Sequence, residues 1–227
     1  MRLFNFKKKQ KPVVITIHGF GKRMHHQFDS ISDFLRTNGY DVIQFDLFDY
    51  NNYQDVDYKI WIERAEQQVR EAQKKYHNNI VLFGYSMGGV IATYLATVFP
   101  VKKLILSAPA YQYLDMSKIV DYGINSIKKA AGKPLDPDAF TSLQTKAFQD
   151  VVAQCKQFIP YVDCPVFLMH GSDDQTIALE SSKKAFQQFK CEKNMVTVEG
   201  GGHHMFYQQP TEHFCHQLVL MELESIK

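Results

Sequence analysis

A serine flanked by glycines is the first feature of the chain that could do chemistry. Ser86 lies at the centre of Gly84-Tyr85-Ser86-Met87-Gly88-Gly89, between an apolar run over 80–83 and a helical run over 90–99. Such a strand-turn-helix context holds a serine hydroxyl above a sheet, and glycines on both sides let the backbones approach closely. The hydroxyl becomes a nucleophile only when a base accepts its proton and a third group orients that base.

Two later segments contain residues that could act as this acid and base. The apolar run 165–170 is followed by Gly171-Ser172-Asp173-Asp174, and the run 194–199 is followed by three glycines and then His203-His204. The order serine, acid, histidine, with each residue on a loop after its own strand, is that of an α/β sheet with a catalytic triad. The spacing therefore predicts a triad of Ser86, one of the two aspartates and one of the two histidines.

The elements that must position these residues follow an alternating pattern. Short apolar runs of strand length alternate with longer segments of helical periodicity, which is typical of a parallel sheet with helices on both faces. Strands are expected over 13–18, 41–47, 79–85, 102–108, 165–170 and 194–199. Helices are expected over 27–38, 56–77, 90–99, 178–189 and 211–225.

The interval from 109 to 160 interrupts this alternation. It has no strand candidate and carries two amphipathic stripes, formed by Ile119, Val120, Gly123, Ile124 and Ile127 and by Leu143, Ala147, Val151 and Cys155. Such stripes can pack on the body of the protein, and they can also form a lid whose apolar underside walls a pocket. We expect a single domain over 1–227 with a small helical lid inserted at about 109–160.

Composition excludes several classes of function. The chain has 26 Lys and Arg against 24 Asp and Glu, a net charge of +2, so we expect no nucleic-acid partner. The four cysteines are widely spaced, which favours reduced thiols and a cytoplasmic location. No apolar stretch approaches the roughly 18 residues of a membrane span, so stable membrane insertion is not expected. No nucleotide-binding motif or metal-ligand pattern stands out, and we expect no cofactor and no metal.

The segments His18-Gly19-Phe20-Gly21, 84–89, 171–174 and 202–203 resemble the landmarks of the α/β-hydrolase superfamily. The resemblance spans nearly the whole chain and is greatest to small bacterial carboxylesterases and monoacylglycerol lipases, which carry a short helical lid. It implies an α/β-hydrolase fold with a mostly parallel sheet. Because the strands begin directly after Pro12, there is no room for the first two strands of the eight-stranded family sheet, and about six strands are expected.

The resemblance also implies roles for individual residues. It makes Asp174 the acid and His203 the base, while Asp173 and His204 stay open as alternatives. It selects the backbone amide of Phe20 as one oxyanion donor. The other donor is expected from Met87, the residue after the nucleophile.

The expected reaction is hydrolysis of a small-molecule carboxylic ester of short to medium acyl chain, through an acyl-enzyme. The same triad could act on thioesters, amides or a carbon-carbon bond. A hydrolase fold that binds a ligand or a protein without catalysis is the alternative from another class. The tyrosine-rich lid could also form the contact of a homodimer.

Overall fold

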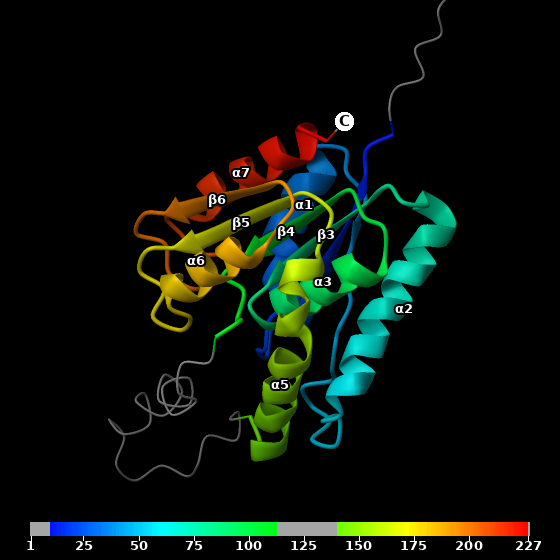
Figure 1. The fold of residues 1–227 in the computed structure, drawn as a ribbon, viewed down its shortest axis with the longest axis vertical. Coiled ribbons are helices and arrows are strands. Elements are labelled where there is room, and N and C mark those ends of the chain that lie inside the picture. The colour runs from blue at the N-terminus through cyan, green and yellow to red at the C-terminus, as the bar shows by residue number, and fades with distance from the viewer. Residues whose placement is uncertain (1–9, 113–139, 227) are drawn as a thin grey trace, which may run out of the picture.

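A six-stranded sheet forms the centre of the computed structural model, which describes residues 10–112 and 140–226 (Figure 1). All neighbouring strands are parallel, and their order is β2-β1-β3-β4-β5-β6. The strands are β1 (Val13–Ile17), β2 (Val42–Ile43), β3 (Ile80–Tyr85), β4 (Lys103–Ser107), β5 (Val166–Gly171) and β6 (Lys193–Val198).

The helices follow the strands in the order that parallel crossovers require. They are α1 (Asp29–Thr37), α2 (Tyr58–Tyr76), α3 (Met87–Val98), α5 (Ser142–Cys155), α6 (Leu179–Gln188) and α7 (Glu212–Glu224). Two 3-10 helices, η1 (Met24–Phe28) and η2 (Lys156–Tyr161), adjoin α1 and α5. No helix among the described residues is long and apolar enough to cross a membrane.

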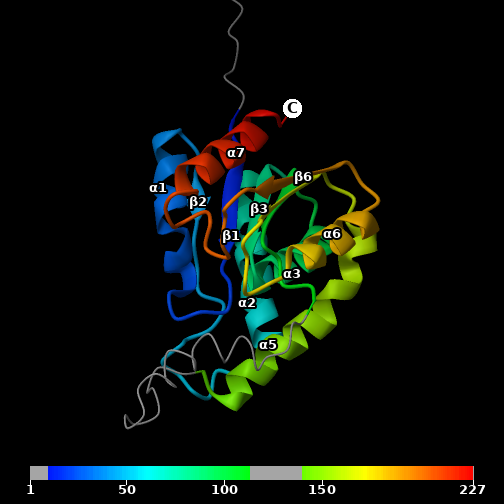
Figure 2. The same ribbon diagram turned by 90° about the vertical axis from the view of Figure 1, so that its left-hand side faces the viewer.

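Helices cover both faces of the sheet. Helices α1 and α7 lie on one face, and α2, α3, α5 and α6 lie on the other (Figure 2). Successive strand residues point to opposite faces, so Val14 joins the cluster around α1 and α7 while Val13 and Ile15 join the larger cluster on the other face. Because both faces are buried, the strands appear in the sequence as continuous apolar runs.

The order of the strands fixes where a site can form. From β1 the sheet extends to β2 on one side and to β3 and the later strands on the other, so the order reverses between β1 and β3. Ligands of open α/β sheets bind at the carboxyl ends of the strands at this switch point. The loop that contains Phe20 follows β1 and Ser86 follows β3, so both lie at this position.

The parallel six-stranded sheet confirms the predicted fold class, and several element boundaries are corrected. Helix α3 covers Met87–Val98 instead of 90–99. Strand β2 covers only 42–43 instead of 41–47. Directly after it the chain turns to other partners, since the Gln44 side chain donates to the His25 carbonyl and to Asp29, and the Leu47 N–H donates to the buried ring of His18. The helix expected over 27–38 is divided into η1, which begins at Met24, and α1, which ends at Thr37.

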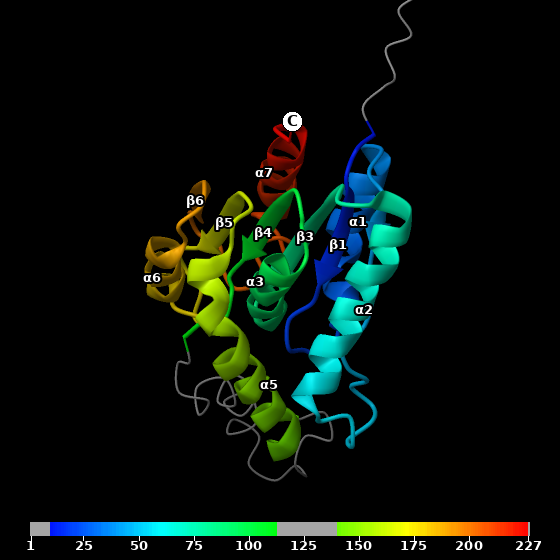
Figure 3. The same cartoon turned by 45° about the vertical axis from the view of Figure 1, so that its right-hand side comes forward.

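One of the two stripes expected in the 109–160 interval forms α5, which packs against α2 and α3 (Figure 3). Ala147, Val151 and Cys155 are buried as predicted, but Leu143 is 59% exposed. A spacing of four residues advances about 40° beyond a full helical turn, so the first member of the stripe rotates away from the core. The other stripe, formed by Ile119, Val120, Gly123, Ile124 and Ile127, lies outside the described residues.

Candidate active site

Ser86 lies in a sharp turn between the last residue of β3 and the first residue of α3. Its backbone has φ 52° and ψ −119°, a conformation that non-glycine residues rarely adopt. The turn is held by hydrogen bonds from Ser86 N to the carbonyl of Ser107 (3.0 Å) and from Gly89 N to the carbonyl of Ser86 (3.1 Å). A Cβ at position 88 would lie 2.0 Å from the carbonyl oxygen of Ile17, so this close approach requires glycine.

His203 connects Ser86 to Asp174. Its Nε2 lies 3.2 Å from the Ser86 Oγ, and its Nδ1 lies 2.7 Å from the Asp174 Oδ2. The three residues follow β6, β3 and β5, whose carboxyl ends meet at one edge of the parallel sheet. An Nδ1–H that donates to the carboxylate leaves Nε2 as the acceptor for the hydroxyl proton, which is the arrangement that nucleophile activation requires.

The carboxylate of Asp174 is fully buried and well supplied with hydrogen-bond donors. Its Oδ1 accepts the backbone N–H groups of Thr176 and Ile177, both at 2.8 Å. Its Oδ2 lies 2.7 Å from His203 Nδ1 and 3.1 Å from His170 Nε2. Burial raises the pKa of Asp174, but hydrogen bonds from His170 and His203 outweigh it and hold the pKa well below its usual range. The carboxylate is therefore ionised at neutral pH.

The neighbouring histidine and aspartate have other surroundings. The Nδ1 of His204 lies 2.7 Å from the Tyr85 hydroxyl and 2.6 Å from the Tyr207 hydroxyl. Burial lowers the pKa of His204 to about 4, so its ring is neutral at pH 7. Asp173 is exposed, and its Oδ1 accepts the hydroxyl of Ser172. The hydrogen bonds from Ser86 therefore lead to His203 and Asp174, and not to His204 or Asp173.

The two residues expected to supply oxyanion donors lie beside the nucleophile. Met87 is the first residue of α3, and Phe20 lies in the loop after β1. This loop touches the nucleophile turn, since a Cβ at position 19 would lie 3.0 Å from the Ser86 Cβ. The N–H of Gly19 donates to Gln27 Oε1 at 2.8 Å, which fixes the loop from its other side.

His18 supports the same loop, and the sequence gives it no role beyond a strand-ending turn. Its fully buried ring is within 2.8 Å of the Gly19 carbonyl through Nδ1 and accepts the Leu47 N–H through Nε2, also at 2.8 Å. Burial lowers the pKa of His18 to about 4, so the ring is a neutral bridge between the loops after β1 and β2. Its position directly before a glycine, at the end of a buried strand, is the one signal in the sequence.

His170 is a second residue that sequence reasoning does not identify. Its buried ring contacts the Asp174 carboxylate and also lies 2.9 Å from the carbonyl of Ile177 through Nε2. Its Nδ1 lies 2.7 Å from the hydroxyl of Ser182 in α6. These contacts fix the acid loop against α6. Nothing in the spacing of the sequence distinguishes His170 from an ordinary strand residue.

A cavity of about 290 Å³ opens beside the nucleophile. Ser86 and His203 line it together with aromatic and polar residues, among them Phe20, Phe148, Arg23, His204 and Tyr207. Phe148 comes from α5, so this helix both packs on the body and walls the cavity. The stripe residues Ala147, Val151 and Cys155 pack on the body, and the role of the inserted segment as a lid stays a prediction.

The described part of the chain has no cluster of side chains that could hold a metal ion. No three His, Cys, Asp or Glu side chains gather closely enough there to hold a metal ion. All four cysteines are free thiols, and Cys155, Cys164 and Cys215 are buried. Burial raises the pKa of these three thiols to about 12, which makes them poor nucleophiles at neutral pH.

The fold and the geometry around Ser86 are those of an α/β hydrolase, and comparison with known proteins gives the family. The model of the alpha/beta hydrolase family matches residues 14–214. The chain belongs to this family.

Among curated proteins, the chain is 26% identical over 245 residues to the protein of Mycoplasma pneumoniae named "Putative esterase/lipase 3", covering 92% of this chain and 86% of that protein. Among solved structures, a monoacylglycerol lipase of Paleococcus ferrophilus matches with a TM-score of 0.71 at 17% identity, covering 94% of each chain. The esterase EaEST of Exiguobacterium antarcticum matches with a TM-score of 0.70 at 20% identity, covering 94% of this chain and 92% of that one. At these identities the two structures show that the fold is shared.

Proposed function

We propose that the chain is a serine hydrolase that cleaves carboxylic esters through an acyl-enzyme, with Ser86 as nucleophile, His203 as base and Asp174 as acid. The observation that carries this proposal is the hydrogen-bonded chain from Ser86 Oγ to His203 Nε2 and from His203 Nδ1 to Asp174 Oδ2. Membership of the family and the relative named as an esterase/lipase support the choice of esters as the substrate class.

The first half of the reaction forms the acyl-enzyme. The Ser86 Oγ attacks the ester carbonyl carbon while its proton passes to His203 Nε2. The backbone amides of Phe20 and Met87 donate to the oxygen that becomes negative in the tetrahedral intermediate. When the intermediate collapses, the bond to the alcohol oxygen breaks, and His203 returns the proton to that oxygen.

The second half reverses these roles with water. Nε2 of His203 takes a proton from water, whose oxygen attacks the acyl carbon, and the proton then returns to Ser86 Oγ as the acid leaves. Asp174 keeps its charge throughout and stabilises the positive His203 ring, which agrees with its strongly lowered pKa.

The aromatic wall of the cavity supports an acyl chain of short to medium length. The ring of Phe20 stacks on Phe148 at 5.2 Å between centroids and on Phe140 at 3.8 Å. Phe20 and Phe148 line the cavity, and an apolar acyl chain that covers their rings would remove further apolar surface from water. Hydrolysis of p-nitrophenyl esters should therefore be maintained or rise from acetate to butyrate. A steep fall as the chain lengthens to octanoate would contradict the medium-chain preference.

The experiment that tests the proposal is hydrolysis of p-nitrophenyl butyrate by the wild type, Ser86→Ala, His203→Ala and His204→Ala, with circular dichroism to confirm folding. Ser86→Ala and His203→Ala should each lower kcat by about 1,000-fold or more, because residues of a triad act as a unit. His204→Ala should retain most of the activity. An inactive wild type, or a Ser86→Ala variant as active as the wild type, would refute the proposal.

A further inference from the structure

The cavity beside Ser86 has two chemically different walls. One wall is formed by the rings of Phe20 and Phe148. The other is formed by His204 and Tyr207, with Arg23 beside the Tyr207 ring. A substrate that is apolar at both ends would not fit the second wall. It would bury the polar groups of that wall without hydrogen-bond partners, which costs free energy.

The ring of His203 determines which half of an ester meets the polar wall. This inference rests on the proposed function, in which His203 returns a proton to the leaving alcohol oxygen, so the alcohol half must lie beside the His203 ring. The ring centroid of His203 lies 5.5 Å from that of His204, which in turn lies 5.0 Å from the Tyr207 ring. We place the alcohol half along these rings, because their contacts lead from His203 through His204 and Tyr207 to Arg23.

Arg23 is the charged group on this path. It is exposed, it lines the cavity, and its guanidinium carbon lies 5.3 Å from the centroid of the Tyr207 ring. Its one hydrogen bond within the described chain is to the carbonyl of His26 at 3.3 Å, and no carboxylate of the described residues pairs with it. Other donors of the guanidinium are therefore open to a ligand.

No carboxylate among the described lining residues compensates the charge of Arg23. The described residues that line the cavity include no Asp or Glu. The carboxylate of Asp174 is buried, and it is satisfied by the backbone N–H groups of Thr176 and Ile177 and by the ring of His203. Met24, the next residue after Arg23, has a positive φ of 45°, which fixes the direction of the loop at this point.

We propose that the ester substrate carries a carboxylate on its alcohol half and that Arg23 binds this group. A guanidinium offers two parallel N–H donors, which match the two oxygens of a carboxylate. Arg23 is then a specificity-determining residue: it selects among esters and takes no part in the proton transfers.

A matched pair of esters tests this assignment. The anionic member is 4-(butanoyloxy)benzoate, and the neutral member is 4-(butanoyloxy)benzamide, which has nearly the same shape and no second ester bond. The measured quantity is the ratio of kcat/KM for the anionic ester to that for the neutral one, determined for the wild type, Arg23→Gln and Arg23→Lys. Because each variant is compared on the same two esters, the difference in leaving-group reactivity cancels.

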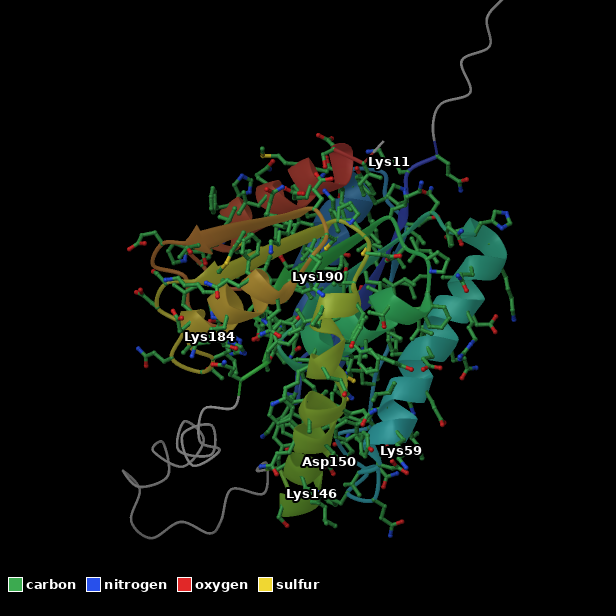
Figure 4. All side chains as sticks on the ribbon, viewed as in Figure 1. Lys11, Lys59, Lys146, Asp150, Lys184 and Lys190 are labelled. Atoms are coloured by element: carbon green, nitrogen blue, oxygen red, sulfur yellow. The ribbon has the colours of Figure 1, made fainter. Side chains whose placement is uncertain are left out.

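Lys190→Gln is the control, because it also removes one positive charge from an exposed position. Lys190, labelled in Figure 4, lies between α6 and the amino end of β6. Ser86 follows the carboxyl end of β3, and the strands are parallel, so the two residues lie at opposite ends of the strands. This variant should keep the anionic to neutral ratio of the wild type within twofold.

Arg23→Gln should lower the ratio about tenfold, equivalent to about 1.4 kcal/mol, mainly by raising KM for the anionic ester. The ratio for Arg23→Lys should lie between the ratios of the wild type and Arg23→Gln, because a lysine keeps the charge and loses the paired donors. Raising the salt concentration should reduce the preference of the wild type and leave that of Arg23→Gln nearly constant.

The inference and the proposed function fail in different ways. If the wild type hydrolyses the neutral ester, Ser86→Ala does not, and Arg23→Gln keeps the wild-type ratio, then the proposed function stands and the role of Arg23 is wrong. If the wild type hydrolyses neither ester nor p-nitrophenyl butyrate, the proposed function is wrong and the inference is overturned with it.

Discussion

Replacing Ser86 with glycine should give a protein that is more stable than the one with alanine at the same position, although both variants lose activity. The reason is the backbone of Ser86, with φ 52° and ψ −119°. This conformation costs a residue with a side chain about 1 to 3 kcal/mol and costs glycine little. The wild type is strained at the residue that we propose as nucleophile.

The comparison with alanine isolates the strain. Both variants lose the hydroxyl and its contact with His203, so the free energy of that hydrogen bond cancels between them. Glycine is less favourable by about 0.5 to 1 kcal/mol, because it loses more backbone freedom on folding. Ser86 borders the cavity, so removing its Cβ leaves little packing to lose. The net expectation is that Ser86→Gly unfolds with a free energy larger than that of Ser86→Ala by about 1 kcal/mol, and by no more than about 2.5 kcal/mol.

Thermal and urea unfolding of the two variants provide the assay. For a chain of this size a difference of about 1 kcal/mol corresponds to about 2 to 4 °C in Tm. Circular dichroism at 222 nm follows both transitions, and p-nitrophenyl butyrate hydrolysis confirms that neither variant retains the activity of the wild type. A glycine variant that melts at or below the alanine variant would show that the turn is not strained at this residue.

Two further predictions concern groups around the site. Gly171→Ala should destabilise the protein by about 3 kcal/mol or more, because the new Cβ would lie 1.9 Å from the Gly201 carbonyl oxygen, whereas Gly202→Ala, with no atom within 4 Å, should be tolerated in the same urea titration. His18 should make stability fall as the pH is lowered from 6.5 to about 4: its folded pKa is depressed, so the unfolded chain takes up the proton first, at a cost of about 3 kcal/mol. Urea unfolding of the wild type and His18→Asn at pH 7, 5.5 and 4 should show a flatter pH dependence for the variant, and equal slopes would contradict the buried, neutral ring.

The fold could be predicted from the sequence because its strands are buried on both faces. Runs such as 80–83 and 104–106 are continuously apolar, and each is followed by a helical segment. Short stretches of the sequence are therefore enough to predict the strands and helices of a parallel sheet. The short β2 could not be predicted in the same way. After Ile43 the chain contacts residues far away in the sequence: Gln44 donates to the His25 carbonyl, 19 positions away, and Leu47 donates to His18, 29 positions away.

In the candidate site, too, some features follow from the local sequence and others depend on contacts between distant segments. The nucleophile turn is readable because its glycines are required by contacts within one strand-turn-helix unit. The choice between His203 and His204 is different, because it depends on how the loop after β6 packs on the loop after β5. Asp173 N donates to the carbonyl of Gly201, and Gly200 takes a positive φ of 68°. These contacts orient the histidine pair, and no local pattern encodes them.

The arrangement of charge connects the proposed chemistry with the proposed specificity. The buried carboxylate of Asp174 is balanced from within, by backbone N–H groups and by the rings of His170 and His203. A buried charge that is satisfied in this way needs no cation from the cavity. The charge of Arg23, at the wall of the same cavity, is therefore not committed to the triad. A carboxylate on the substrate would compensate it without disturbing the hydrogen bonds that keep His203 in position for proton transfer.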